Sequence, residues 1–294
     1  MKTNRFAPRP DLKIYLDGEL VPAPDAKISV FDHALLYGDG VFEGIRVYNG
    51  RIFECQAHLN RLFESAAAIR LEMPVTREEL VAAMEKSVKA NGVVNGYIRV
   101  VVTRGVGTLG IDPQRSACPS LIIIADRIQL FSPDLYEKGM AIITAATCRN
   151  HPNAMPPRIK SLNYLNNILA KLEAIQAGCE EAVMLNHEGY VAECTGDNIF
   201  IIKDGALRTP PPYAGLLLGI TRAVIIKLAR RRDIAVQEMM LTRHDLYMAD
   251  ECFLTGTGAE IMPVTRIDNR VIGSGVPGAI TRQLLADFVE YRSQ

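Results

Sequence analysis

The stretch from Glu193 to Arg222 places an acidic residue, two turns and a helix start in a close order. Glu193 follows a predicted strand, and Asp204-Gly205 turns the chain back after a second, β-branched strand. Gly219-Ile220-Thr221 then opens a segment whose apolar residues have helical spacing. Backbone N–H groups at a helix start, with a threonine hydroxyl beside them, bind anions such as phosphate. The stretch therefore offers a carboxylate and an anion site.

Lys160 is a candidate nucleophile. It lies where the proline-rich passage 151–160 meets a helix predicted over 162–176, so rigid flanks would hold its side chain toward a cleft. From position alone a lysine is most often a solvated surface group. The motif around it makes the chemistry specific.

These segments resemble the signature of the class IV, or fold-type IV, pyridoxal-phosphate enzymes. An ordinary surface hairpin followed by an amphipathic helix is the structural alternative, and so many matches in a fixed order argue against it. The matching residues are Ile159 to Tyr164 around the lysine, Glu193, Asn198-Ile199-Phe200, Thr209 and Gly219 to Arg222. The resemblance implies pyridoxal 5′-phosphate (PLP) as the cofactor and no metal.

The resemblance also implies roles for three catalytic residues. Lys160 would condense with the aldehyde of PLP and then carry a proton between substrate and cofactor. Glu193 would keep the pyridine nitrogen protonated, so that the ring accepts electrons. Tyr164 would donate to the ring's phenolic oxygen, although a buried helix tyrosine is the alternative.

The remaining cofactor contacts implied by the family lie in several segments. Arg61 matches the phosphate-binding arginine, and a planar guanidinium suits that bidentate task. Leu217 would lie against one face of the pyridine ring. The other expected contacts are Asn198, Ile220 and Thr221 near the helix start, and Gly256 and Thr257 in the glycine-rich TGTGAE.

The segment Tyr37 to Arg46 is similar to the branched-chain aminotransferase pattern, in which Tyr37, Phe42 and Gly44 would shape an apolar pocket. Arg46 and Leu109 are further expected substrate contacts. Tyr97 and Arg99 stand two residues apart on a predicted strand, and so on one face. The alternative is a pair of outward residues on a surface strand.

One site for leucine, isoleucine or valine and also for glutamate must neutralise glutamate's second carboxylate, because burying that charge without a partner is prohibitive. The resemblance gives this task to Arg99. The α-carboxylate would meet backbone N–H groups at Thr257, Gly258 and Ala259. The expected reaction transfers an amino group from a branched-chain L-amino acid to 2-oxoglutarate.

Three other activities remain open: a D-amino-acid aminotransferase, an aminodeoxychorismate lyase and a PLP-binding protein without turnover. D-specific relatives use an arginine and a histidine in the loop after Thr103-Arg104-Gly105, and this loop has no histidine. The spacing of Lys160 and Tyr164 matches the D-type pattern, however. The lyase has no need of the Tyr97 and Arg99 pair, and intact Lys160 and Glu193 argue against a scaffold.

Composition excludes several partner classes. The 33 basic and 33 acidic residues give zero formal net charge, so no broad field attracts nucleic acid or an anionic membrane. Six scattered cysteines without zinc-like spacing read as reduced thiols. We expect a cytoplasmic protein with small-molecule partners. The resemblance implies a homodimer or larger assembly in which Tyr37 and the Leu109 loop complete the neighbour's pocket.

The order of elements predicts an α+β fold with two domains. The family resemblance makes the N-terminal domain an α/β sandwich over 1–130 and the C-terminal, PLP-binding domain a pseudo-barrel over 139–294, with the cofactor in the cleft between them. Ser132-Pro133 indicates a linker at 131–138. The clearest expected helices are 58–70, 76–90 with a capping box at Thr76 and Glu79, and 221–231.

Overall fold

The computed structural model describes residues 9, 11–116 and 118–294, and the chain divides into two compact units. Unit 1 runs to Ile128 and takes in the short segment Lys160–Asn163, whereas unit 2 comprises Gln129–Ile159 and Tyr164–Gln294. The chain thus returns to unit 1 at the candidate lysine. The sequence predicts instead two successive domains, with the chain passing only once from the first to the second. Of the expected linker 131–138, the part Pro133–Lys138 is helical and belongs to unit 2.

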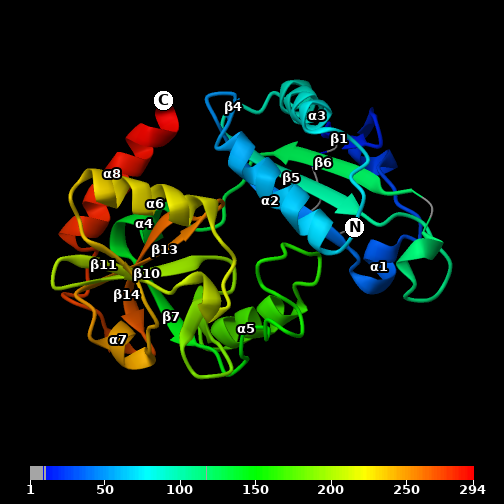
Figure 1. Cartoon of the computed structure of the whole chain (residues 1–294). Helices are drawn as coiled ribbons and strands as arrows, with labels where there is room; N and C mark the ends of the chain where they lie inside the picture. Colours follow the sequence, from blue (N-terminus) through cyan, green and yellow to red (C-terminus); the bar gives the residue numbers. More distant parts are fainter. Residues whose placement is uncertain (1–8, 10, 117) are drawn as a thin grey trace, which may run out of the picture. The chain divides into compact units, whose positions relative to one another are not determined.

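Unit 1 contains one antiparallel sheet in the order β2-β1-β6-β5-β3-β4 (Figure 1). Its helices and strands are β1 (Lys13–Leu16), β2 (Glu19–Pro22), α1 (His33–Tyr37), β3 (Gly40–Tyr48), β4 (Arg51–Ile52), α2 (Cys55–Ala68), α3 (Arg77–Ala90), β5 (Gly96–Thr103) and β6 (Ser120–Asp126).

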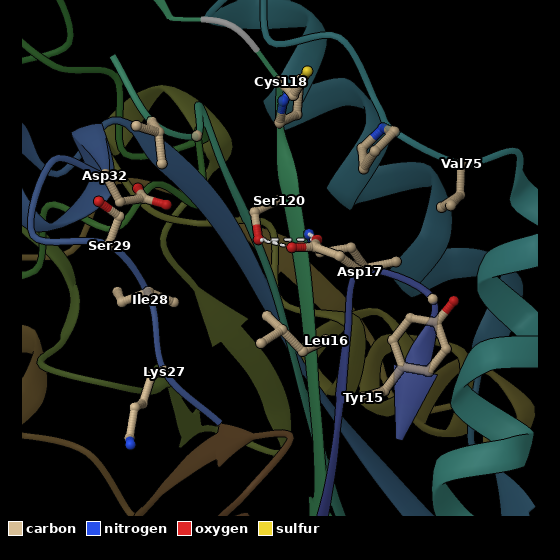
Figure 2. Close-up of a pocket in the computed structure, with 16 residues that line it drawn as sticks. Tyr15, Leu16, Asp17, Lys27, Ile28, Ser29, Asp32, Val75, Cys118 and Ser120 are labelled. Carbon is tan, nitrogen blue, oxygen red and sulfur yellow. Dashed lines mark hydrogen bonds between the residues drawn. The ribbon is translucent and has the colours of Figure 1, made fainter. Parts of the chain in front are cut away.

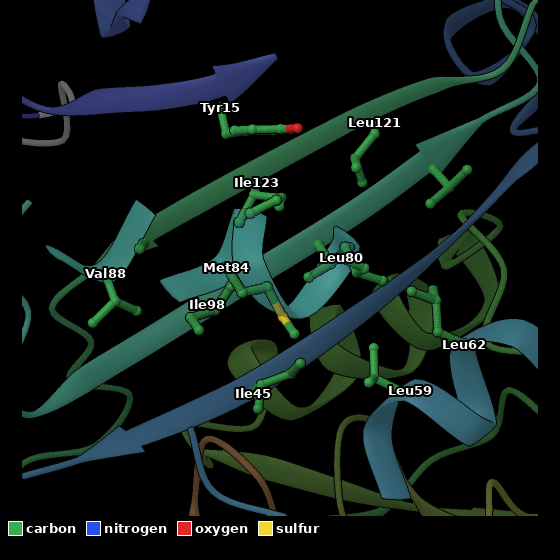
Figure 3. Packing of buried hydrophobic residues seen from close by; sticks show 14 of the residues in the cluster. Tyr15, Ile45, Leu59, Leu62, Leu80, Met84, Val88, Ile98, Leu121 and Ile123 are labelled. Atoms are coloured by element: carbon green, nitrogen blue, oxygen red, sulfur yellow. The ribbon is translucent and has the colours of Figure 1, made fainter. Parts of the chain in front are cut away.

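The core of unit 1 lies between this sheet and the helices α2 and α3 (Figure 3). Side chains alternate between the two faces of β5 and β6, so that every second residue is buried against the helices. Leu59 and Leu62 of α2 and Leu80 and Met84 of α3 are fully enclosed, and truncating such a side chain to alanine costs about 2–5 kcal/mol. The predicted capping box at Thr76 and Glu79 is confirmed and starts α3.

Unit 2 contains a mixed sheet in the order β12-β11-β10-β13-β14-β7-β8-β9, with β15 paired to β14. Its helices and strands are α4 (Pro133–Lys138), β7 (Met140–Thr144), α5 (Leu165–Gln176), β8 (Glu181–Leu185), β9 (Val191–Cys194), β10 (Asn198–Lys203), β11 (Ala206–Thr209), α6 (Ile220–Arg231), β12 (Val236–Glu238), α7 (Arg243–Tyr247), β13 (Glu251–Gly256), β14 (Glu260–Ile267), β15 (Arg270–Val271) and α8 (Ala279–Ser293).

The sheet of unit 2 curls. β9 stands at one end of the strand order and β10 close to the other, yet only residues 195–197 join them, and Cys194 N donates to Asp197 O at 2.7 Å. Because so short a loop cannot bridge a flat sheet of this width, the strands must bend round into the half-barrel of the predicted pseudo-barrel. In the described part of the chain, no helix has the length and apolar character needed to cross a bilayer.

Candidate active site

The backbone of Lys160 is fixed within unit 1. Its carbonyl oxygen accepts from Phe42 N at 3.0 Å, and its own N–H donates to Ser65 Oγ of α2 at 3.1 Å. Two residues later, Leu162 N donates to Gly40 O at 3.0 Å. The lysine is therefore joined to the start of β3 and to α2, and its side chain begins from a rigid base.

The side chain of Phe42 lies close to two cations. The Lys160 ammonium nitrogen lies 4.5 Å from the centre of its ring, and the Arg99 guanidinium carbon also lies 4.5 Å from it. Tyr97 is on the same face of β5, with Arg99 5.6 Å from its ring. The structure thus brings together the predicted lysine, an apolar ring and the predicted carboxylate-binding arginine.

Gly44 makes room for Tyr97. The two strands pair so that Gly44 faces Arg99 and Arg46 faces Tyr97. A Cβ atom at Gly44 would overlap the hydroxyl of Tyr97, so any larger residue would displace the tyrosine. The Arg46 guanidinium carbon lies 5.7 Å from the ring of Tyr48.

Tyr37 and the Leu109 loop meet in the same chain. Gly110 N donates to the Tyr37 hydroxyl at 2.8 Å, which anchors the loop to α1 and leaves Leu109 70% exposed. Arg104 is committed elsewhere, since its guanidinium pairs with Asp39 at 2.9 Å. It also donates to the carbonyl oxygens of residues 69 and 70. This arginine is therefore engaged in holding the fold rather than offered to a substrate carboxylate.

Arg61 of α2 forms a two-pronged ion pair with Glu43 of β3. Arg61 Nε lies 2.6 Å from Glu43 Oε1, and Nη2 lies 2.9 Å from Oε2. His58 Nδ1 lies 2.7 Å from the same Oε2. Burial alone would raise the pKa of Glu43, but the charge of Arg61 and the hydrogen bonds from His58 and Arg61 outweigh it and lower that pKa to about 2. Glu43 is therefore a carboxylate at neutral pH.

In unit 2, Glu193 of β9 is buried and accepts three hydrogen bonds. Arg149 Nε donates to Oε1 at 2.8 Å, while Asn198 Nδ2 and Leu217 N donate to Oε2 at 3.2 and 3.1 Å. Asn198 Nδ2 also donates to Leu217 O at 2.9 Å. All three hydrogen bonds favour the charged form of the side chain, and they fix the orientation of its two carboxylate oxygens.

The predicted helix start is confirmed as the beginning of α6, with Gly219 as its N-cap residue and Ile220 and Thr221 buried in its first turn. The amide of Asn198 fills the space beside Gly219, where a Cβ atom would overlap Asn198 Oδ1. Half-buried Leu217 precedes this turn. Glu193, Asn198, Leu217 and the helix start are therefore one connected group.

Thr257, Gly258 and Ala259 form the turn between β13, which ends at Gly256, and β14. Tyr136 of α4 donates from its hydroxyl to Ala259 O at 3.1 Å and supports this turn. Tyr164 is half-buried, and it lies before α5 rather than within it. The helix begins at Leu165, three residues later than predicted, because residues 160–163 are extended along β3 instead.

Unit 1 also has a cleft of about 550 Å³, drawn in Figure 2. Asp17, Ile28, Asp32, Cys118 and Ser120 are among its lining residues. The carboxylate of Asp17 is occupied by Ser120 Oγ at 2.9 Å and Leu121 N at 2.7 Å. None of the predicted site residues lines this cleft, so the cleft is separate from the chemistry inferred from the motifs.

Sequence reasoning missed Arg149, Glu43 and His58. Glu43 carried a usable signal, because it is an acidic residue inside the apolar run VFEGIRVY, where an unpaired charge would be costly. The sequence around Arg149 gives no such signal, because the residue that it pairs with is 44 positions away.

Comparison with known proteins identifies the family. Residues 40–267 match the family model described as amino-transferase class IV. The chain belongs to the class IV aminotransferases.

Several similar proteins within this family are branched-chain-amino-acid aminotransferases. A protein of Methanocaldococcus jannaschii is 49% identical over 283 residues, covering 96% of this chain and 97% of that protein. The branched-chain-amino-acid aminotransferase of Pseudomonas aeruginosa is 40% identical over 92% of this chain and 90% of its own length. A branched-chain amino acid aminotransferase from T.th., solved with pyridoxamine 5′-phosphate, superposes with a TM-score of 0.92 at 38% identity, covering 96% of this chain and 94% of that one. The same enzyme has also been solved with N-(5′-phosphopyridoxyl)-L-glutamate.

Proposed function

We propose that this chain is a PLP-dependent branched-chain aminotransferase, which moves an amino group between leucine, isoleucine or valine and 2-oxoglutarate. The observation that carries the proposal is the arrangement around Phe42, where an apolar ring lies 4.5 Å from both the Lys160 ammonium and the Arg99 guanidinium. An aliphatic side chain packs against the ring, and a second carboxylate pairs with the arginine. One pocket can then serve both amino-group donors.

The donor set fits PLP. A pyridine nitrogen requires an oriented carboxylate, and Glu193 is buried and held by three donors. A phosphate requires N–H donors, and the start of α6 supplies them together with Thr221. Arg61 is our candidate for a further phosphate contact. PLP, when bound, supplies the electron sink for breaking the bond to the α-hydrogen.

Each of the other predicted site residues would have its own role in the reaction. Lys160 would hold the cofactor, and its amine would accept the α-proton of the substrate and return it on the cofactor side. Glu193 would keep the pyridine nitrogen protonated, and Tyr164 would donate to the phenolic oxygen. Backbone N–H groups of the turn 257–259 orient the α-carboxylate, and Tyr136 keeps that turn in place.

The first test is a panel of single amino acids mixed with the PLP-loaded protein, with the absorbance of the bound cofactor followed in time. L-Leucine and L-glutamate should convert the cofactor to its amine form, and D-alanine and D-glutamate should leave it unchanged. Conversion by the D-amino acids would overturn the proposal in favour of a D-specific enzyme.

The second test separates the two kinds of substrate. Arg99→Met should lower kcat/KM for glutamate roughly 100-fold, because a buried carboxylate loses its partner, and should change that for leucine less than about fivefold. Replacing the exposed Arg127 in the same way is the matched control and should affect neither. Equal losses for the two substrates would contradict the role of Arg99.

The proposal includes a homodimer in the cytoplasm. Leu165, Ile168, Leu169, Leu172 and Ile175 make an apolar stripe on α5 and are 47–66% exposed. A contiguous stripe of this kind is typical of a protein interface. All six cysteines are free thiols, which is typical of a reducing compartment. Light scattering should report twice the 32.4 kDa chain mass, and a Leu169→Glu variant should shift it toward the monomer.

A further inference from the structure

The ion pair of Arg61 and Glu43 fixes the orientation of the arginine. Glu43 stands between Phe42 and Gly44 along β3, so its side chain lies on the helix-covered face while that of Phe42 lies on the other. Two parallel N–H···O bonds of 2.6 and 2.9 Å determine both the position and the plane of the guanidinium. Glu43 is fully buried, whereas 12% of the Arg61 side chain is exposed.

His58 in turn holds Glu43. Because the ionised carboxylate can only accept, the 2.7 Å contact makes His58 Nδ1 the donor. Burial lowers the pKa of His58, which favours the neutral ring, and in the neutral ring that donates from Nδ1 the Nε2 atom carries no proton. Nε2 is buried and has no hydrogen-bond partner among the described residues. The ring therefore acts through Nδ1.

Helix α2 carries these groups in register. His58, Arg61 and Ser65 stand at i, i+3 and i+7, which places them on one face of the helix. Ser65 accepts from the backbone N–H of Lys160, and Arg61 and His58 contact Glu43 of β3. One helix face is thus joined to the lysine segment and to the strand that carries the substrate pocket.

We propose that Glu43 and His58 are positioning residues for the cofactor phosphate, with Glu43 holding Arg61 in its binding orientation and His58 holding Glu43. The inference rests on the proposed role of Arg61 as a phosphate ligand. A long arginine side chain loses rotamer freedom when it is ordered, and an arginine that is already ordered binds without that cost. A cluster that served only the fold would affect stability and leave phosphate recognition unchanged.

The experiment compares the affinity of the apoprotein for PLP with its affinity for pyridoxal, which lacks the phosphate. The ratio of the dissociation constant for pyridoxal to that for PLP isolates the phosphate contact from contacts with the ring. Glu43→Gln should reduce this ratio roughly tenfold or more, as happens when a buried partner that orients a ligand is removed. In an Arg61→Met background the same substitution should cause no further loss. A loss of equal size in both backgrounds, or no loss in the native one, would overturn the inference.

A pair of variants at His58 tests the second contact and does not require Glu43→Gln to fold. Asparagine places an N–H donor close to the position of Nδ1, whereas leucine fills similar space without any donor. His58→Asn should keep the native ratio and His58→Leu should lose it. If the two variants behave alike, His58 has no positioning role. Thermal melting of each apoprotein reports folding independently.

The Arg61→Met variant separates failure of this inference from failure of the proposed function. If that variant keeps the native preference for PLP over pyridoxal, Arg61 is not a phosphate ligand and the inference falls with that role. If it loses the preference while Glu43→Gln does not, the role of Arg61 stands and only the inference fails.

Discussion

Each unit contains a buried arginine–carboxylate pair, and the two pairs are built in opposite senses. In unit 1 the carboxylate of Glu43 is fully enclosed, and the arginine is the member with exposed surface. In unit 2 both members are buried, and it is the carboxylate of Glu193 that collects three donors, Arg149 among them. One pair orients a cation and the other orients an anion.

The comparison indicates why charged residues occupy these positions. Buried ion pairs are weak stabilisers, because the cost of taking both charges out of water largely offsets their attraction. Apolar residues of similar volume would often serve stability as well or better. A pair that orients one member toward a phosphate or a pyridine nitrogen has a use that apolar residues cannot supply. In unit 1 the enclosed Glu43 is then the support, and in unit 2 the support is Arg149, whose guanidinium contacts with residues other than Glu193 are long.

The largest effect should come from the pair in unit 2. Glu193→Gln removes the charge proposed to face the pyridine nitrogen, and amino transfer from L-glutamate should slow by about 100-fold or more. Arg149→Met leaves that charge in place but less well oriented, so the loss should be about tenfold, and Arg149→Lys should recover part of it. Stopped-flow absorbance of the bound cofactor measures all three. A larger loss for Arg149→Met than for Glu193→Gln would reverse the roles assigned here.

The pair in unit 1 should affect how the free energy of unfolding changes with pH in acid. The pKa of Glu43 is lowered from 4.5 to about 2 in the folded chain, so its contribution is complete above pH 4.5 and is lost as pH falls from 4.5 toward 2. The linked free energy is on the order of 3 kcal/mol. Thermal melting of the apoprotein across this range should be less steep in pH for Glu43→Gln than for the native chain. The exposed Glu78 of α3, changed in the same way, is the control and should leave the slope unaltered.

Local patterns predict several elements of this site. The α6 start with Gly219 and Thr221 and the capping box at Thr76 depend on neighbours in the sequence, and both are confirmed. Strand β3 is not among the predicted strands, because Gly40 and Gly44 weaken the strand signal. The reason for Gly44 lies on the next strand, where Tyr97 occupies the space of its missing side chain.

Long-range pairings are beyond the sequence. Nothing around Arg149 indicates that it will meet a glutamate 44 residues later, and nothing around Lys160 indicates that its segment rejoins β3 and α2. The family motif identifies Lys160 and Glu193 as candidate reacting groups. Which residues orient them depends instead on the order of the strands. The supports of a site are for this reason harder to read from a sequence than its reacting groups.

The smallest expected effect concerns the groups behind Arg149. Asn166 and Asn167 of α5 each present Oδ1 3.4 Å from Arg149 Nη1, a long contact that contributes little. Asn167 is buried and its amide donates to Thr195 O at 2.7 Å, whereas Asn166 is half-buried and donates to Cys148 O at 2.8 Å in an exposed bond. Asn167→Ala should therefore lower the free energy of unfolding by about 1–3 kcal/mol, and Asn166→Ala by less than about 1 kcal/mol. Because both variants keep the 2.8 Å bond from Arg149 to Glu193, amino transfer should change by less than about threefold in either.

Urea denaturation measures the free energy of unfolding, and the glutamate half-reaction measures the rate of amino transfer separately. If Asn166→Ala slows amino transfer as much as Arg149→Met does, the orientation of Glu193 depends on more residues than Arg149. The contrast between a pair that orients a cation and a pair that orients an anion would then no longer hold.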